Sequence, residues 1–172
     1  YDPVRPHNRL SDTDAVGRTT RTTYNAQNLV ETVTLPSGAV TEYRDYNAFA
    51  QPQRIKDARG NWTWLRYDAW GNLLDSIAVR SGVTPSAGVQ PASPDIVAWQ
   101  KTAYDPSGNP TTRTQVRNFS TGVGPSVTQT WDASRFNLLS LTRSGLRSDG
   151  GGGLVSVTPT TSPAFIYDAA AR

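Results

Sequence analysis

The residues of this chain that could carry acid–base chemistry are its carboxylates, twelve Asp and two Glu in 172 residues. A glycosidase-type mechanism needs two carboxyl groups at a set separation, and nothing in the sequence singles out two of the twelve Asp. The chain has one histidine, His7, and no cysteine. This excludes a disulfide framework, a thiolate nucleophile, a Cys-ligated zinc and a site of several histidines. We therefore expect no catalytic residues, no metal site and no cofactor.

The aspartates follow aromatic residues in a motif that recurs along the chain, most clearly as Tyr-Asp-Ala-Trp-Gly-Asn-Leu at 67–73. The Asp carboxylate can accept a backbone N–H inside a turn, and Gly supplies the positive φ at which the chain reverses. Turn capping is therefore the favoured role of these carboxylates. Successive leading aromatics are 23, 22, 21, 37, 27 and 36 residues apart. The residues that we expect to define the repeat structurally are Tyr24, Tyr46, Tyr67, Asp68, Gly71, Asn72, Tyr104, Asp105, Gly108, Asn109, Trp131, Asp132, Tyr167 and Asp168.

The composition indicates which elements position these residues. Glu and Lys occur twice each and Met is absent, whereas the chain has 21 Thr, 15 Ser, 14 Gly and 12 Pro. Because helix formers are scarce, long helices are not expected. Sixteen aromatic residues are more than a disordered chain of this kind carries. With turn signals about every ten residues, we predict an all-β fold of tandem antiparallel β-hairpins.

The strands and loops can be placed from this turn spacing. We predict strands at 29–35, 39–46, 53–56, 61–67, 73–79, 96–104, 111–119, 127–131, 138–146, 154–158 and 164–167. The stretch 80–95, with three prolines and three serines, and the glycine-rich stretch 148–153 are predicted loop insertions. The whole of 1–172 is expected to be a single repeat region. Because the chain begins at Tyr1 rather than at Met, we expect it to be a piece of a longer protein.

Charge and hydropathy limit the classes of partner. The net charge is +3 and the arginines are spread along the chain, so no nucleic-acid partner is expected. No apolar run approaches the roughly 18 residues of a membrane helix, so no membrane span is expected. Trp62 and Trp64, with nearby arginines, could form a sugar-stacking surface and are the candidate carbohydrate contacts. Burial in the sheet is the competing role, because alternate strand residues must be buried.

Three quoted stretches carry a resemblance to a known family. Tyr-Asn-Ala-Phe at 46–49, Asp-Ala-Arg-Gly-Asn at 57–61 and Tyr-Asp-Ala-Trp-Gly-Asn-Leu at 67–73 resemble the YD-repeat (Rhs-repeat) family. Weaker copies cover nearly the whole chain. The later copies depart from the pattern, since Trp131 stands where Tyr is usual and Asn137 where Gly is expected.

The resemblance implies an architecture and, through it, a function. YD repeats in bacterial Rhs polymorphic toxins, in the B and C subunits of insecticidal toxin complexes and in teneurins form a β-sheet that spirals into a hollow shell, which in the bacterial proteins encloses a toxin domain. This implies a non-enzymatic, secreted or extracellular wall segment. Its partners would be the remainder of its parent protein or copies of itself, and an enclosed toxin domain. Two alternatives stay open: a carbohydrate-binding or adhesion module with a glycan partner, and a β-rich fibre subunit that self-assembles through its end strands.

Overall fold

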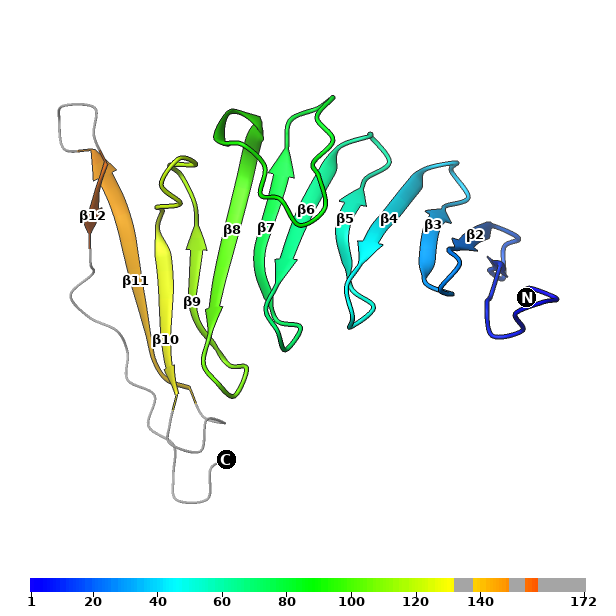
Figure 1. Ribbon diagram of the computed structural model, residues 1–172, viewed down its shortest axis with the longest axis horizontal. Coiled ribbons are helices and arrows are strands. Elements are labelled where there is room, and N and C mark those ends of the chain that lie inside the picture. Colours follow the sequence, from blue (N-terminus) through cyan, green and yellow to red (C-terminus); the bar gives the residue numbers. More distant parts are fainter. Residues whose placement is uncertain (132–137, 149–153, 158–172) are drawn as a thin grey trace, which may run out of the picture. The chain divides into compact units, whose positions relative to one another are not determined.

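The structure, a computed structural model, describes residues 1–131, 138–148 and 154–157. Apart from one single-turn 3-10 helix, η1 (Ser93–Asp95), the regular elements among these residues are strands (Figure 1). They are β1 (Ser11–Thr13), β2 (Thr19–Tyr24), β3 (Val30–Thr34), β4 (Val40–Tyr46), β5 (Pro52–Lys56), β6 (Trp62–Tyr67), β7 (Leu73–Val79), β8 (Ile96–Tyr104), β9 (Pro110–Gln115), β10 (Ser126–Trp131), β11 (Leu138–Ser148) and β12 (Leu154–Val157). The predicted all-β fold is confirmed.

The strands follow one another in the sheet in the order of the chain. Adjacent strands pair antiparallel, as β4 does with β5 and β8 with β9. The chain divides into two compact units, which are described separately below. Unit 1 comprises Tyr1–Arg66 and Ile77–Val97, and unit 2 comprises Tyr67–Ser76 and Ala98–Arg172. No helix among the described residues is long and apolar enough to cross a membrane.

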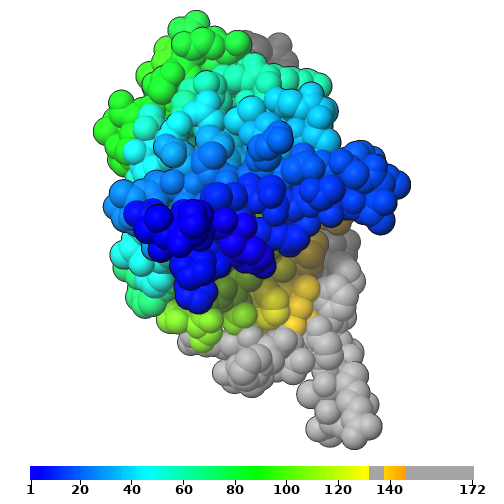
Figure 2. Space-filling model, turned by 90° about the vertical axis from the view of Figure 1, so that its right-hand side faces the viewer, coloured from blue at the N-terminus to red at the C-terminus, as the bar shows by residue number. Residues whose placement is uncertain are grey.

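Some strand boundaries differ from the predicted ones. β1 and β2 were not predicted, because neither contains an aliphatic residue. All three residues of β1 are exposed, and in Figure 2 the dark-blue N-terminal segment lies at the surface that faces the viewer. The strand predicted at 111–119 ends at Gln115. Beyond it the Asn118 side chain accepts the backbone N–H groups of Ser120 and Thr121, at 3.1 and 3.2 Å, which favours a turn over a continued strand. The strand predicted at 164–167 and the loop residues 149–153 lie outside the described residues.

Few side chains are fully buried in either unit. The buried apolar residues of unit 1 are Trp64, Leu65, Ile77, Val79 and Ile96, and those of unit 2 include Trp99 and Val116. Most other strand positions are half-buried, and in β3 and β5 every residue is so. A sheet whose strand residues are mostly half-buried needs fewer apolar side chains than a two-layer core. This accounts for the low hydrophobic content of the chain.

The 80–95 loop of unit 1 folds back across the sheet and is held at both ends and in its middle. Arg80 and Asp95 are joined by an ion pair of 2.7 Å and by a backbone hydrogen bond of 2.8 Å. In the middle of the loop, Pro85 is buried, and its carbonyl accepts a hydrogen bond of 2.7 Å from the Arg54 guanidinium. Figure 1 shows this loop turning back beside β6. The loop is therefore tied to β5 and closed at its own ends rather than free.

Candidate functional site

The five-residue turn that begins at Asp68 is the structural core of the repeat motif. The Asp68 backbone N–H donates to the Asn72 carbonyl at 3.0 Å, and the Gly71 N–H donates back to the Asp68 carbonyl at 3.2 Å. Gly71 has φ of 88°, the left-handed conformation that closes a hairpin of this length. The same pair of backbone bonds closes the turns that begin at Asp14, Asn25, Leu35, Asn47, Asp57 and Asp105.

The first side chain of the turn caps it from within. In Asp68, Oδ1 accepts the backbone N–H groups of Trp70 and Asn72, both at 2.9 Å, and Oδ2 accepts the Asn72 amide at 2.9 Å. Asp105 repeats this pattern with Ser107 and Asn109. The carboxylates of both turns are thus occupied in holding the chain reversal, as capping carboxylates do.

These hydrogen bonds also set the charge state of the turn carboxylates. The bond from the Asn61 backbone N–H is the largest influence on Asp57 and lowers the pKa of its carboxyl. The backbone N–H of Arg18 lowers the pKa of Asp14 in the same way. For Asp68 burial acts in the opposite direction, but the hydrogen bonds from Asn72 and neighbouring backbone groups outweigh it and the pKa is lowered. A carboxyl held ionised in this way is poorly suited to act as a general acid near neutral pH.

The aromatic residue that leads each motif connects one hairpin to the one before it. The Tyr104 hydroxyl donates to the carbonyl of Leu73 at 3.1 Å, and the Tyr46 hydroxyl donates to that of Val30. Each acceptor lies six residues after the preceding leading aromatic. Tyr24 bonds the carbonyl of Arg9 at 3.1 Å. Burial raises the pKa of the Tyr46 and Tyr67 hydroxyls, which keeps them protonated.

Trp131 occupies the position of this tyrosine in the next copy of the motif. Its indole Nε1–H donates to the carbonyl of Pro110 at 3.0 Å, and Pro110 again lies six residues after the leading aromatic of the preceding copy. The departure from the sequence pattern therefore preserves the hairpin-to-hairpin bond, because an indole N–H can donate where a phenol O–H does. Asp132, Asn137, Tyr167 and Asp168 lie outside the described residues.

The two tryptophans predicted as carbohydrate contacts lie on one face of β6 but differ in exposure. Trp62 is half-buried, with the Arg54 guanidinium 5.3 Å and the Lys56 ammonium 5.7 Å from its ring centre. Trp64 is only 1% exposed. It lies opposite Arg54 in the β5–β6 register, and Arg54 carries the bond to Pro85 of the 80–95 loop. Trp64 therefore cannot stack on a sugar in this structure, which corrects the expectation of a tryptophan pair.

The same face of unit 1 carries a network of charges. The Arg44 guanidinium bonds both Glu31 and Glu42, and Glu42 also accepts the Lys56 ammonium at 3.1 Å. These hydrogen bonds, with the one from Arg44 largest, lower the pKa of the Glu42 carboxyl. Arg54 pairs separately with Asp45. Both cations that flank Trp62 are therefore paired, Lys56 within the network and Arg54 with Asp45.

A polar pair that the sequence did not reveal lies inside unit 2. Asp75 is 1% exposed, and its Oδ1 accepts the indole Nε1–H of Trp99 at 2.7 Å. Lys101 lies over the Trp99 ring at 5.4 Å from its centre. The bond that Asp75 accepts comes from Trp99 of β8, which the chain reaches only after the 80–95 loop. Asp75 shares one face of the strand with the apolar residues Leu73 and Ile77. This placement is the sequence signal that could have indicated its burial.

This arrangement offers no catalytic constellation among the described residues. The turn carboxylates cap turns, Glu42 and Glu31 belong to an ion-pair network, and Asp75 is buried under an indole. No group of three or more His, Cys, Asp and Glu side chains is placed to hold a metal ion within the part of the chain that the structure describes. What the geometry does support is mechanical: hairpins closed by capped turns and tied to one another by aromatic donors.

Comparison with known proteins bears on the fold. A search with the sequence finds no matching family model and no matching curated protein. Among solved structures, the chain is similar to TcdB2-TccC3-TEV, with a TM-score of 0.59 and 18% identity over 93% of this chain. It is similar to TcdB2-TccC3 without its hypervariable C-terminal region, with a TM-score of 0.57 and 18% identity over 91% of this chain.

A third similar structure is the Tc holotoxin pore of Photorhabdus luminescens carrying a TccC3 mutation, with a TM-score of 0.57 and 19% identity over 91% of this chain. In each comparison this chain spans only 9% of the length of the solved chain. At these identities the likeness shows the fold, and it is the antiparallel all-β fold that the repeat predicts.

Proposed function

We propose that this chain is a structural wall segment of a secreted bacterial YD-repeat protein, forming part of a β-sheet shell that encloses a toxin polypeptide. It performs no catalysis of its own. Its partners are the remainder of the parent protein, or copies of itself, and the enclosed polypeptide. The observation that carries the proposal is the fold likeness to Tc toxin proteins, which extends over more than nine-tenths of this chain.

The bonding between hairpins supports this role. A wall that isolates a cargo must transmit strain from one repeat to the next without a thick core. The bonds from Tyr46 to Val30 and from Tyr104 to Leu73 supply such ties, one for each hairpin concerned. The geometry favours a wall over glycan binding, because Trp64 is buried and the cations beside Trp62 are already paired.

Protease protection tests the proposal. The polypeptide that carries this chain together with its flanking sequence is purified, and cleavage of the enclosed domain is followed by mass spectrometry. The expected result is protection that is lost faster in Tyr46→Ala and Tyr104→Ala, since each substitution removes a tie between hairpins. Arg59→Ala, at an exposed turn tip, is the matched control and should leave protection unchanged. Equal cleavage of the flanking domain in the intact protein and as a free domain would overturn the proposal.

A further inference from the structure

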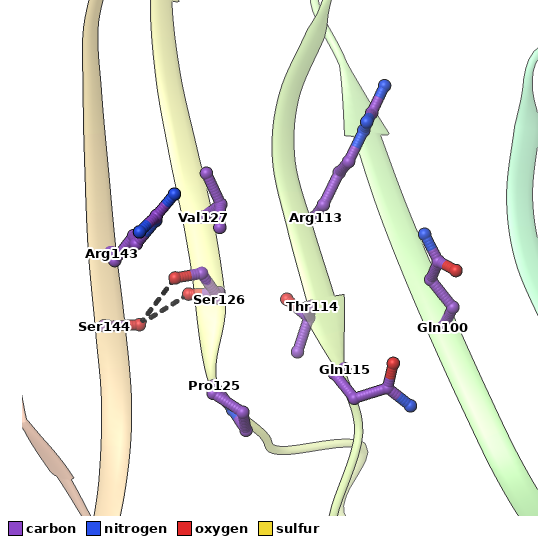
Figure 3. A pocket seen from close by; sticks show the side chains of 9 residues that line it. All are labelled: Gln100, Arg113, Thr114, Gln115, Pro125, Ser126, Val127, Arg143 and Ser144. Carbon is purple, nitrogen blue, oxygen red and sulfur yellow. Dashed lines mark hydrogen bonds between the residues drawn. The ribbon is translucent and has the colours of Figure 1, made fainter.

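A hollow of about 350 Å³ lies on unit 2 across strands β8 to β11. Figure 3 shows its lining residues, among which Arg113 of β9 and Arg143 of β11 stand on either side of Val127 of β10. Val127 is the register partner of both arginines. Because directly paired residues of an antiparallel sheet share a face, the three side chains form a row of cation, apolar group and cation.

The two arginines are exposed and have no ion-pair partner among the described residues of the chain. This sets them apart from Arg44 and Arg54 of unit 1, which bond carboxylates. The acidic residues of unit 2 that the structure describes are Asp68, Asp75 and Asp105, and all three are engaged in turns or buried under an indole. The positive charge of the row is therefore not compensated within the described part of unit 2.

Further residues of polar type lie beside this row, and the hollow is open. Gln100 and Gln115 face each other in the β8–β9 register and lie on the same face as Arg113. Gly145 lies two residues beyond Arg143 on β11, and a Cβ built there would meet nothing within 4 Å. The face thus offers two permanent positive charges, two amide side chains and the apolar side chain of Val127, with room above them for the backbone of a ligand.

We propose that this row binds an extended acidic polypeptide segment with the pattern carboxylate, any residue, apolar residue, any residue, carboxylate. Strands lie about 4.8 Å apart, so the two arginine Cα atoms are separated by about 10 Å. Alternate side chains of an extended peptide share a face, and carboxylates four residues apart lie about 13 Å from each other. The long, rotatable arginine side chains can reach across that difference, and the central apolar residue meets Val127.

Arginine suits this role because its guanidinium stays charged and can bond a carboxylate through two parallel N–H groups. The inference goes beyond the proposed function, since it holds for any acidic segment, whether enclosed or external. It commits to a polypeptide, because the spacing of two charges around an apolar centre matches side chains on an extended backbone. Binding to a polyanion of regular charge would not need Val127.

The test uses the full 172-residue chain and a fluorescein-labelled peptide containing Asp-Thr-Val-Thr-Asp, followed by fluorescence anisotropy at low salt. We expect saturable binding that weakens about ten-fold in Arg113→Gln and in Arg143→Gln, as expected for loss of a charge-assisted hydrogen bond. Because both charges are exposed, added salt should weaken it further. Arg21→Gln, at an exposed strand arginine of unit 1, is the matched control and should bind like the unaltered chain.

Two further peptides make the result decisive. A peptide with Asn in place of both Asp should not bind, and one with the two Asp adjacent should bind at least five-fold more weakly if the spacing matters. Equal binding by the adjacent-Asp peptide or by a heparin oligosaccharide would overturn the proposal in favour of a nonspecific cation patch. Unchanged affinity in both arginine variants would also overturn it. Far-UV circular dichroism of each variant confirms that the fold is retained.

Discussion

Units 1 and 2 each bury a tryptophan almost completely, but they treat the indole N–H differently. Trp64 of unit 1 is 1% exposed, and its Nε1 has no hydrogen-bond partner among the described residues. Trp99 of unit 2 is 5% exposed and donates to the buried carboxylate of Asp75 at 2.7 Å. The first indole is buried with its N–H unpaired among the described residues, whereas the second is fixed by a specific polar partner.

The difference extends to the charges around the two rings. In unit 1, Arg44 and Lys56 are neutralised on the sheet face by Glu31 and Glu42. In unit 2 the one fully buried charge lies inside, while Arg113 and Arg143 remain without a partner on the surface among the described residues. The ion pairs of unit 1 thus lie on a half-buried face, whereas the acidic side chain of Asp75 lies in the interior of unit 2. Losing a hydrogen-bond partner costs more free energy in the interior.

The largest expected effect follows from removing each indole N–H in turn. Trp99→Phe should lower the free energy of unfolding by about 2–3 kcal/mol, because it leaves a buried carboxylate with one bond fewer and removes ring volume. Trp64→Phe should cost about 1 kcal/mol, since the volume lost is offset by removal of an unsatisfied N–H. Urea unfolding followed by far-UV circular dichroism measures both.

Hydrogen exchange resolves the effect by hairpin, which matters because repeat proteins do not always unfold in one step. The control is Trp70→Phe, at a turn tip where the ring is 76% exposed, and its effect should lie within about 0.5 kcal/mol. Equal losses in Trp64→Phe and Trp99→Phe would mean that the Asp75 bond contributes nothing and that the two units are held in the same way.

A second, smaller effect compares the turns of the two units. Ala50 in the Asn47 turn of unit 1 has φ of 57°, whereas Gly108 takes the same position in the Asp105 turn of unit 2 with φ of 85°. A side chain in the left-handed region costs about 1–2 kcal/mol. Ala50→Gly should therefore stabilise unit 1 by about 1 kcal/mol and Gly108→Ala should destabilise unit 2 by about as much. Thermal unfolding of both variants checks the opposite signs, and a shared sign would contradict the comparison.

The turns were the part of this fold that the sequence predicted best, because their determinants are local. Asp68 caps and Gly71 reverses the chain through bonds that span five residues, so the pattern is complete within the motif itself. β2 was missed for the opposite reason. Its threonines form a strand only because β3 lies alongside, where Thr23 and Thr32 share a hydroxyl bond of 2.7 Å.

The candidate site residues also differ in whether their surroundings are set locally or by distant parts of the chain. The half-burial of Trp62 and the full burial of Trp64 cannot be read from β6, because the two residues lie on the same face of that strand and have the same place in its alternation. The Asp75–Trp99 pair joins residues 24 positions apart, with the 80–95 loop between them in the chain. Contacts made over an insertion carry no periodic signal, whereas the hairpin ties recur with the repeat.

A third prediction concerns the charge network of unit 1. Glu42→Gln removes the anion shared by Arg44 and Lys56 and should destabilise unit 1 by about 0.5–1 kcal/mol at low salt, the range of a partly exposed network. High salt should reduce the difference, since half-exposed charges are screened. Arg117→Gln on unit 2, where the arginine is exposed, is the comparison and should have a smaller effect. Chemical unfolding at two salt concentrations measures both.

The smallest effect is a dependence on pH, which should fall more heavily on unit 1 because Glu42, Asp14 and Asp57 lie there, whereas the lowered pKa of Asp68 belongs to unit 2. Hydrogen bonds hold the pKa of Glu42 below its ordinary value of 4.5 and the pKa of Asp14 and Asp57 below 3.8. A carboxyl with a lower pKa when folded stabilises the folded state above its unfolded pKa, and this contribution is lost as the pH falls through the folded pKa. Stability should therefore be level above about pH 5 and decline below pH 4. Hydrogen exchange at pH 5 and pH 3, with Asp57→Asn as the variant that removes one titrating group, should show protection falling first in the hairpins of β3 to β6. A uniform fall across both units would mean that the charges of unit 1 give it no separate acid sensitivity.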